Sequence, residues 1–294
     1  MKHAILGAGG VGGLVGACLA HEGESVTVVV RKDALARYPK QLQLESPFGN
    51  FAVDVDVSST VPPVDVLWIT VKATQLDSAL AALCDGADVG AIVPLLNGID
   101  HVDSLRAKYG ADRVIPATIA VESERVAPGH IVHRSPFARL NVSSKGRTRL
   151  GPSIEQLQRL GFTCNFTDDE PTLLWSKLVF LAPVALNTTA ADKPVGQIRD
   201  DSALWNKLQS AVREACAVAV KEGANVDADA VNSIIRNLPP GSRSSMQKDV
   251  EKGNPPELDA IGGPILRGAR RHGIQIPVTE ELIATIKRRI GEPN

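Results

Sequence analysis

The chain has 294 residues, a length typical of two domains. Its 32 Lys and Arg residues are balanced by 33 Asp and Glu residues, and the formal net charge of -1 argues against a nucleic-acid partner and against an acidic tail. With 44% hydrophobic and 22% charged residues, the composition is that of a globular protein that can bury a core without disulfide bonds. No C-x-x-C pattern occurs, so we expect neither a disulfide framework nor a zinc site, and a reducing compartment, the cytoplasm, is the expected location. The four cysteines are Cys18, Cys84, Cys164 and Cys216.

The N-terminal apolar stretch superficially resembles a secretory signal. Residues 7–13, however, contain five glycines, a run that disfavours an apolar helix and favours a strand-to-helix turn. We therefore expect this stretch to be part of the folded protein. The longest apolar run elsewhere, residues 178–186, is far shorter than the roughly 20 residues of a membrane span, and no membrane partner is expected.

Short apolar strands alternate with helical segments in the first half of the chain, which predicts an α/β fold with a mostly parallel sheet and helices on both faces. The expected strands are residues 3–6, 25–30, 64–71 and 91–96, with helices over 11–21 and 75–83. Residues 42–57 are expected to form a β-hairpin that turns at 48–50, and three further β segments cover 114–121, 130–134 and 139–142.

Helical patterns dominate the second half. Asp168-Asp169-Glu170-Pro171 has the acids and the proline that mark a helix start. A period of three and four then places apolar residues on one helix face, and Pro and Gly residues divide the segment into short helices. The sequence predicts an all-α domain over residues 168–294 that follows an α/β domain over residues 1–167. The face comprises Trp205, Leu208, Val212, Cys216 and Ala219.

The segment from Gly7 to Gly12 fits the pattern G-x-G-x-x-G, between a predicted strand and a predicted helix. In a dinucleotide-binding turn, Gly7 permits the tight turn, Gly9 permits close approach of the pyrophosphate, and Gly12 permits close helix–strand packing. The phosphate lies on the free amides at the helix N-terminus, which here include Gly10 and Val11. An ordinary strand-to-helix turn is the alternative. The pattern predicts that residues 1–167 form a Rossmann domain.

Basic residues follow two of the predicted strands. Arg31 and Lys32 stand where an NAD-binding domain has an acid for the ribose, and an arginine there favours the 2′-phosphate of NADP. Lys72 ends the strand that begins at residue 64 and is expected to meet the phosphate or ribose. Asn97 follows the next strand and is expected to line the same crevice. The alternatives are a solvated basic strand end for Arg31 and a simple turn residue for Asn97.

Several segments together resemble the ketopantoate reductase (2-dehydropantoate 2-reductase) family over nearly the whole chain. They include the glycine loop, Leu96-Asn97-Gly98 and Leu174-Trp175-Ser176-Lys177-Leu178. The most specific part is Ser244-Ser245-Met246 followed by Asp249, then Glu257-Leu258-Asp259-Ala260-Ile261, then His272-Gly273-Ile274 and Pro277.

The resemblance implies NADPH-dependent reduction of a 2-oxo acid, 2-dehydropantoate, to the 2-hydroxy acid pantoate, a step of pantothenate biosynthesis. Lys177 matches the catalytic lysine, which polarises the ketone and supplies a proton as hydride arrives from nicotinamide. Glu257 matches the acid near the substrate, Ser245 a serine that contacts the substrate carboxylate, and Asn97 an asparagine near nicotinamide and substrate. Without the resemblance, Lys177 is a solvated helix lysine and Glu257 an ordinary first-turn acid.

The sequence departs from the family at asparagine positions. Leu181, Ala185 and Val195 stand where members carry asparagines after the catalytic lysine, Asn187 lies on a different helical azimuth, and Gly262 replaces another asparagine. Leu181 and Ala185 are expected on the face of Lys177, bordering the substrate. Two alternatives therefore stay open: a reductase of a less polar carbonyl, and an NADP-binding sensor without turnover.

Two further expectations concern partners and metals. A homodimer through the helical domain is the assembly that we expect. His130 and His133 lie three residues apart in a predicted strand, on opposite faces, so no metal site is expected.

Overall fold

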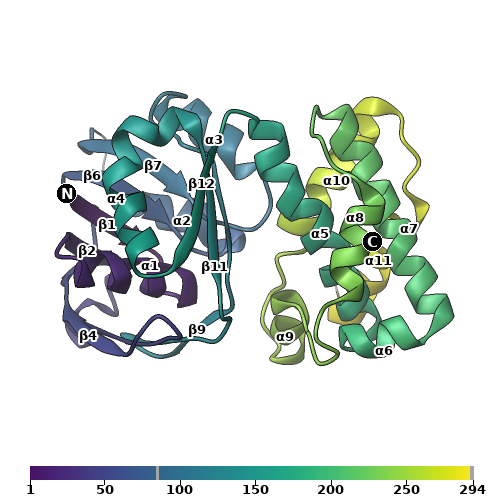
Figure 1. Cartoon of the computed structure of the whole chain (residues 1–294), viewed down its shortest axis with the longest axis horizontal. Helices are drawn as coiled ribbons and strands as arrows, with labels where there is room; N and C mark the ends of the chain where they lie inside the picture. The colour runs from purple at the N-terminus through teal and green to yellow at the C-terminus, as the bar shows by residue number, and fades with distance from the viewer. Residues whose placement is uncertain (84–85, 292–294) are drawn as a thin grey trace. The chain divides into compact units, whose positions relative to one another are not determined.

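The computed structural model describes residues 1–83 and 86–291. They fall into two compact units, of which the first holds residues 1–96 and 101–170 and the second holds residues 97–100 and those from 171 onward (Figure 1). The division near residue 170 lies three residues beyond the expected boundary. The grouping of residues 97–100 with the second unit has no counterpart in the sequence patterns.

The first unit is built on a five-stranded sheet in which every neighbouring pair is parallel, in the order β5-β2-β1-β6-β7. The strand order reverses between β1 and β6, and in Rossmann sheets the carboxyl ends of the strands at such a reversal bind the dinucleotide. The predicted α/β class is confirmed. The strands are β1 (Lys2–Leu6), β2 (Ser25–Val29), β5 (Asp56–Ser58), β6 (Val64–Ile69) and β7 (Val89–Pro94).

Helix α1 (Gly10–His21) packs between the central sheet and a second sheet. A Cβ atom on Gly13 would lie 2.4 Å from Ile131 of the second sheet, and one on Gly16 would lie 3.1 Å from Ile5 of the central sheet. The glycine run therefore lets the helix fit between two sheets, and the N-terminal stretch is folded, as predicted. The second sheet has the order β4-β3-β10-β9, with β3 (Gln41–Glu45), β4 (Phe51–Asp54), β9 (Ser123–Ala127) and β10 (His130–His133).

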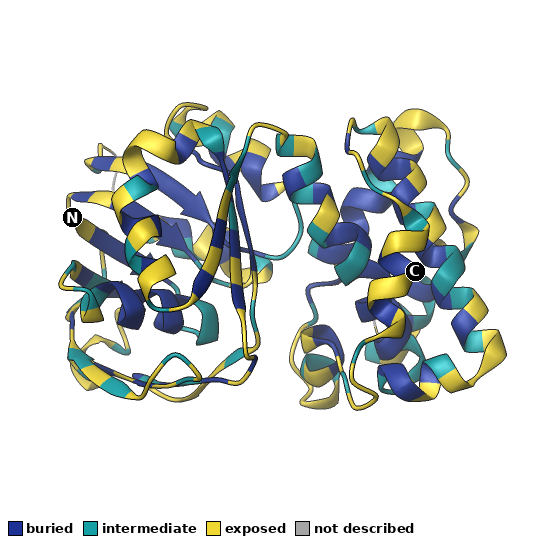
Figure 2. Cartoon of the chain, viewed as in Figure 1, coloured by how far each residue is buried: buried dark blue, intermediate teal, exposed yellow. Residues whose placement is uncertain are grey.

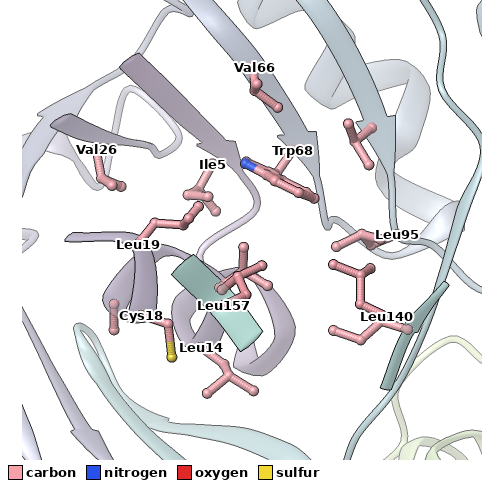
Figure 3. Close-up of a cluster of buried hydrophobic side chains, with 14 of the residues drawn as sticks. Ile5, Leu14, Cys18, Leu19, Val26, Val66, Trp68, Leu95, Leu140 and Leu157 are labelled. Carbon is pink, nitrogen blue, oxygen red and sulfur yellow. The ribbon is translucent and has the colours of Figure 1, made fainter. Parts of the chain in front are cut away.

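Apolar side chains cover both faces of the central sheet. Val66 and Trp68 of β6 join one buried cluster, in which Ile5 of β1 and Leu157 of α4 also lie (Figure 3). Leu67 and Ile69 of β6 belong to a different cluster on the other side, with side chains of α2 (Leu76–Ala79) and α3 (His101–Tyr109). A third sheet, of order β12-β11-β8, contributes further side chains to the first cluster, as does helix α4 (Arg147–Arg159). Its strands are β8 (Ala117–Ala120), β11 (Ala138–Ser143) and β12 (Phe162–Thr167).

Some predicted elements differ in the structure. The helix expected over residues 75–83 is broken into α2 and the flanking 3-10 turns Ala73–Gln75 and Leu80–Ala82. The hairpin is confirmed for β3 and β4, but its last residues form β5 of the central sheet. Residues 114–121 are not one strand, since β8 begins after Pro116 and Val114 makes only an isolated bridge to Ile92. Helices α3 and α4 and strands β9 and β12 were not among the predicted elements.

All described secondary structure from residue 171 to 291 is helical, as predicted. The predicted apolar face of α7 is buried, Trp205 and Cys216 included. Helix α5 is long and apolar enough to cross a membrane by length and composition alone, yet 67% of that window is buried inside the fold, as in a core helix (Figure 2). The helices are α5 (Glu170–Ala191), α6 (Val195–Asp200), α7 (Ser202–Lys221), α8 (Ala228–Arg236), α9 (Ser245–Glu251), α10 (Leu258–His272) and α11 (Pro277–Ile290).

Three of the cysteines, Cys18, Cys164 and Cys216, are buried free thiols. Burial raises the pKa of each of these thiols, to about 12 for Cys18 and Cys164 and about 11 for Cys216. Cys84 lies outside the described residues.

Candidate functional site

Gly7 and Gly12 form the closely packed part of the glycine loop. Gly7 has φ +114°, a left-handed conformation that favours glycine, and its carbonyl accepts a 2.7 Å hydrogen bond from the Thr70 hydroxyl. A Cβ atom on Gly12 would lie 2.3 Å from the Gly7 carbonyl oxygen. Thr70 at the end of β6 therefore ties the loop to the neighbouring strand, a role that the sequence analysis missed.

Gly9 is the open part of the same loop. A Cβ atom on Gly9 would have no described atom within 4 Å, and its backbone (φ -87°, ψ -165°) is extended. Gly9 also stands at the N-cap of α1, where no side chain of the described residues caps the helix. The amides of Gly10, Val11 and Gly12 in the first turn are thus placed to receive an anion. This arrangement fits the pyrophosphate of a dinucleotide.

Gly10 also has a packing function that the motif does not specify. A Cβ atom on Gly10 would lie 2.1 Å from the Ser123 carbonyl oxygen of β9, and the Ser123 hydroxyl donates a 2.9 Å hydrogen bond to the Gly10 carbonyl. The helix N-terminus is therefore held against β9 independently of any ligand.

The basic residues predicted to bind the cofactor follow the carboxyl ends of β2 and β6. The Arg31 side chain is 86% exposed and lies 3.9 Å from the carboxylate of Asp33. Lys32 and Lys72 are also exposed. A guanidinium this accessible is able to bind a phosphate monoester with two parallel hydrogen bonds.

In the second unit, Lys177 lies in the second turn of α5 and is half-buried. Burial lowers the pKa of Lys177 to about 8, although the negative charge of the Glu257 carboxylate acts to raise it. At neutral pH the ammonium is mostly protonated, and it is a much stronger acid than an exposed lysine. These are the properties of a general acid.

Glu257 stands at the N-cap of α10 and is 6% exposed. Its carboxylate accepts a 2.9 Å hydrogen bond from the side-chain amide of Asn97. Two residues that the sequence analysis took from segments 160 positions apart are thus in direct contact, and the charge of Glu257 acts on Lys177. Asn97, Glu257 and Lys177, all in the second unit, are thus linked by one hydrogen bond and one charge interaction.

Of the two adjacent serines, Ser244 is buried and Ser245 is exposed at the start of α9. The Ser244 hydroxyl accepts a 3.0 Å hydrogen bond from the backbone amide of Gln247 and lies 2.9 Å from the Thr188 hydroxyl of α5. Ser244 therefore caps α9 and joins it to α5. This role of Ser244 was not predicted, although Ser-x-x-Gln is a capping-box pattern.

The expectation that Ala185 borders the substrate is wrong for the described structure. Ala185 is 0% exposed and belongs to the apolar core of the second unit, as does Val195. Leu181 is only partly buried and packs against that core. Leu181 shares the side of α5 on which Lys177 lies, whereas the helix has rotated Ala185 further into the core by that turn.

Local packing accounts for the departure at Gly262 and for the role of Asn187. A Cβ atom on Gly262 would lie 2.8 Å from Cδ1 of Ile283 in α11, so a larger residue would require the Ile283 side chain to move. The side-chain amide of Asn187 donates a 2.8 Å hydrogen bond to the Pro183 carbonyl and is buried. Asn187 therefore does not supply the donor that the family has at the other positions.

The first unit is a Rossmann unit with free space at Gly9 of its phosphate-binding turn, and the second is a helical unit with a lysine of lowered pKa. This combination is typical of a dinucleotide-dependent oxidoreductase. Residues 3–146 match the family described as ketopantoate reductase PanE/ApbA, and residues 172–289 match its C-terminal counterpart. The chain belongs to the ketopantoate reductase PanE/ApbA family, whose members are oxidoreductases that act on a CH–OH group with a nicotinamide cofactor.

Among its relatives, the 2-dehydropantoate 2-reductase of Caulobacter vibrioides is 31% identical over 96% of this chain and 97% of its own length. Among solved structures, a PanE/ApbA family ketopantoate reductase from Ralstonia eutropha JMP134 is 26% identical and superposes with a TM-score of 0.86, over 99% of both chains. D-mandelate dehydrogenase, solved with NADH and anilino(oxo)acetate, is 20% identical with a TM-score of 0.85 over 99% of both chains, and shares the fold.

Proposed function

We propose that this chain is an NADPH-dependent reductase of the ketopantoate reductase type, which converts a 2-oxo acid such as 2-dehydropantoate into the 2-hydroxy acid. The observation that carries the proposal is the group formed by Lys177, Glu257 and Asn97, in which burial lowers the pKa of the lysine to about 8. Membership of a family of oxidoreductases supports it.

The proposed roles follow from the chemistry of a ketone. When bound, the nicotinamide supplies hydride to the carbonyl carbon. The Lys177 ammonium donates a hydrogen bond to the carbonyl oxygen, stabilises the negative charge that grows there, and then transfers its proton to it. Glu257 keeps Lys177 charged until that transfer, and Asn97 orients the Glu257 carboxylate. The exposed Ser245 hydroxyl is proposed to bind the substrate carboxylate.

The experiment that tests this function is an NADPH-oxidation assay over a panel of 2-oxo acids that includes 2-dehydropantoate. Turnover of any member supports a reductase. An NADP-binding sensor, one of the two alternatives from the sequence, would bind NADPH tightly and oxidise it with no substrate of the panel. A cytoplasmic location and a homodimer through the helical domain stay predictions.

Cofactor preference is expected to depend on Arg31. One charge-assisted bidentate contact to the 2′-phosphate contributes about 1.5–3 kcal/mol, so NADPH is expected to bind roughly tenfold to a hundredfold more tightly than NADH. Arg31→Ala should remove most of this preference by weakening NADPH alone. Dissociation constants of both cofactors, for the wild type and the variant, measure the effect. Arg37→Ala, which changes an exposed arginine of the following 3-10 turn, is the control. Equal affinities of the wild type for the two cofactors would contradict the assignment.

The surface of α5 around Lys177 favours a particular side chain on the substrate. Leu174, Phe180 and Leu181, which lie three or four positions from Lys177 along the helix, are partly exposed and apolar. None of these side chains offers a hydrogen bond to a substrate hydroxyl, and a buried hydroxyl without a partner costs about 1–3 kcal/mol. A 2-oxo acid with an apolar side chain is therefore the second candidate substrate.

We expect the wild type to have a higher kcat/KM for 2-oxo acids with apolar side chains than for 2-dehydropantoate. Leu181→Asn should shift the ratio of the two kcat/KM values about tenfold towards 2-dehydropantoate, because the amide offers the missing partner. Ala185→Asn is the matched control: it places the same amide in the core, so it should lower the melting temperature and leave the ratio unchanged. A wild type that prefers 2-dehydropantoate by a wide margin would show that other residues bind its hydroxyl.

A further inference from the structure

We infer that Arg267 is a positioning residue, which fastens residues 97–100 to helix α10 so that Asn97 stays on the Glu257 carboxylate. The inference rests on the proposed function, because the proposed reaction uses Asn97 and Glu257. No pattern in the sequence singled out Arg267, and all the residues involved belong to the second unit.

The guanidinium of Arg267 joins two carboxylates. Its Nε donates a 2.9 Å hydrogen bond to Oδ2 of Asp100, and Nη2 contacts the same oxygen. Its Nη1 donates a 2.8 Å hydrogen bond to Oδ1 of Asp259, in the first turn of α10. Asp259 follows Glu257 by two residues. One side chain therefore connects the last residue of the 97–100 segment to the helix end that carries the site carboxylate.

The 97–100 segment is thus held on α10 at both of its ends. Asn97 bonds Glu257 at the first end, and Asp100 bonds Arg267 at the second. Between them, Gly98 has φ +81°, and a Cβ atom on it would lie 2.3 Å from the Ala260 carbonyl oxygen. The backbone of the segment therefore lies directly on the helix, in a conformation that favours glycine.

A second glycine makes room for the guanidinium. A Cβ atom on Gly263 would lie 2.4 Å from Nη2 of Arg267 and 2.5 Å from Oδ1 of Asp259. The ion pair therefore crosses the helix surface directly above Gly263. An added methyl group at this position displaces the guanidinium without any change of charge.

These ion pairs fix the position of residues 97–100 and add little to the free energy of unfolding of the whole protein. The side chains of Arg267, Asp100 and Asp259 are 40%, 46% and 84% exposed, and exposed ion pairs contribute about 0–1 kcal/mol to folding. A catalytic group, by contrast, loses much of its effect when it moves by about 1 Å. Arginine suits the task because its planar fork reaches two carboxylates at once, whereas the lysine ammonium is a point charge.

The test is Arg267→Met in the full-length protein, with amide hydrogen exchange of residues 97–100 followed by mass spectrometry. We expect exchange in this segment to become roughly tenfold faster, while the melting temperature stays within about 2 °C of the wild type. Gly263→Ala should reproduce the effect, and Arg267→Lys should be intermediate. The control is Arg271→Met, which removes a guanidinium from the same helix that pairs with Glu222 instead.

Kinetic measurements test whether Arg267 affects catalysis by positioning Asn97. We expect Arg267→Met to lower kcat about tenfold, and Asn97→Ala to lower it more. If Arg267 acts through Asn97, then Arg267→Met has little further effect in the Asn97→Ala background. Losses that multiply in the double variant would overturn the inference.

The two readouts separate the inference from the proposed function. If residues 97–100 of the Arg267→Met variant exchange at the wild-type rate, the inference is overturned, whatever the activity of the variant. Faster exchange in a protein whose wild type reduces no 2-oxo acid supports the attachment of the segment and refutes the proposed reaction. A large fall in melting temperature, with exchange faster throughout α10, would show a general structural role and also overturn the inference.

Discussion

Lys177→Met is expected to lower kcat for 2-oxo acid reduction by about 10²–10⁴-fold, the usual contribution of a general acid. Affinity for NADPH should change little, because the ammonium acts mainly on charge that develops in the transition state. Methionine keeps the unbranched side chain up to the position of Cε and removes the charge. Steady-state kinetics and cofactor titration measure the two effects. The matched control is Lys221→Met, at the exposed end of α7.

The same residue is expected to set the alkaline limb of the pH profile. Reduction needs the protonated ammonium, and burial lowers the pKa of Lys177 to about 8. Below that pH the acid is in its active form, so kcat/KM, whose pH dependence reports the free enzyme, should level off there and fall tenfold per pH unit above it. A variant with near-normal kcat, or one that keeps the same alkaline limb, would remove Lys177 from the mechanism.

Gly9→Ala is expected to fold like the wild type and to bind NADPH at least about tenfold more weakly. A Cβ atom on Gly9 meets no described atom within 4 Å, and the extended backbone there suits alanine, so the melting temperature should not change. The added methyl group occupies the space through which the pyrophosphate approaches the helix amides. Thermal unfolding and cofactor titration are measured on the same samples.

Gly12→Ala is the contrasting variant. Its Cβ atom would lie 2.3 Å from the Gly7 carbonyl oxygen, a backbone atom that cannot move away freely. Overpacking of this kind costs about 1–3 kcal/mol, so this variant should melt at a lower temperature even without cofactor. If Gly9→Ala binds NADPH normally, the phosphate does not approach at Gly9 and the proposed geometry of the cofactor site is incorrect.

The parts of the fold that the sequence predicted are those with strong local signals. Gly7 needs a positive φ, and alternating apolar residues in β6 must face two different cores, so the turn and the strand were both visible in the residues. Helix α4 was missed because its apolar positions are few and Pro152 and Gly151 interrupt them. Residues 75–83 looked helical by periodicity, but they fold into short turns.

The candidate site was predictable residue by residue, but its connections were not. The position of Asn97 after a strand and the family resemblance of Glu257 indicated the two residues separately, and only the fold shows that they share a hydrogen bond. Arg267 had no local signal, because its partners lie 8 and 167 positions away. The error at Ala185 has a similar cause, since helical spacing does not reveal which side of α5 the core covers.

The grouping of residues 97–100 with the second unit also bears on inheritance. A hybrid gene with a single crossover at residue 170 would take Asn97 and Asp100 from one parent, and Glu257 and Arg267 from the other. Residues 97–100, which lie between β7 and α3, therefore form one unit of exchange with the C-terminal half. In recombination between relatives, a productive hybrid has to transfer this short segment together with α10, as a second, separate insert in the N-terminal half.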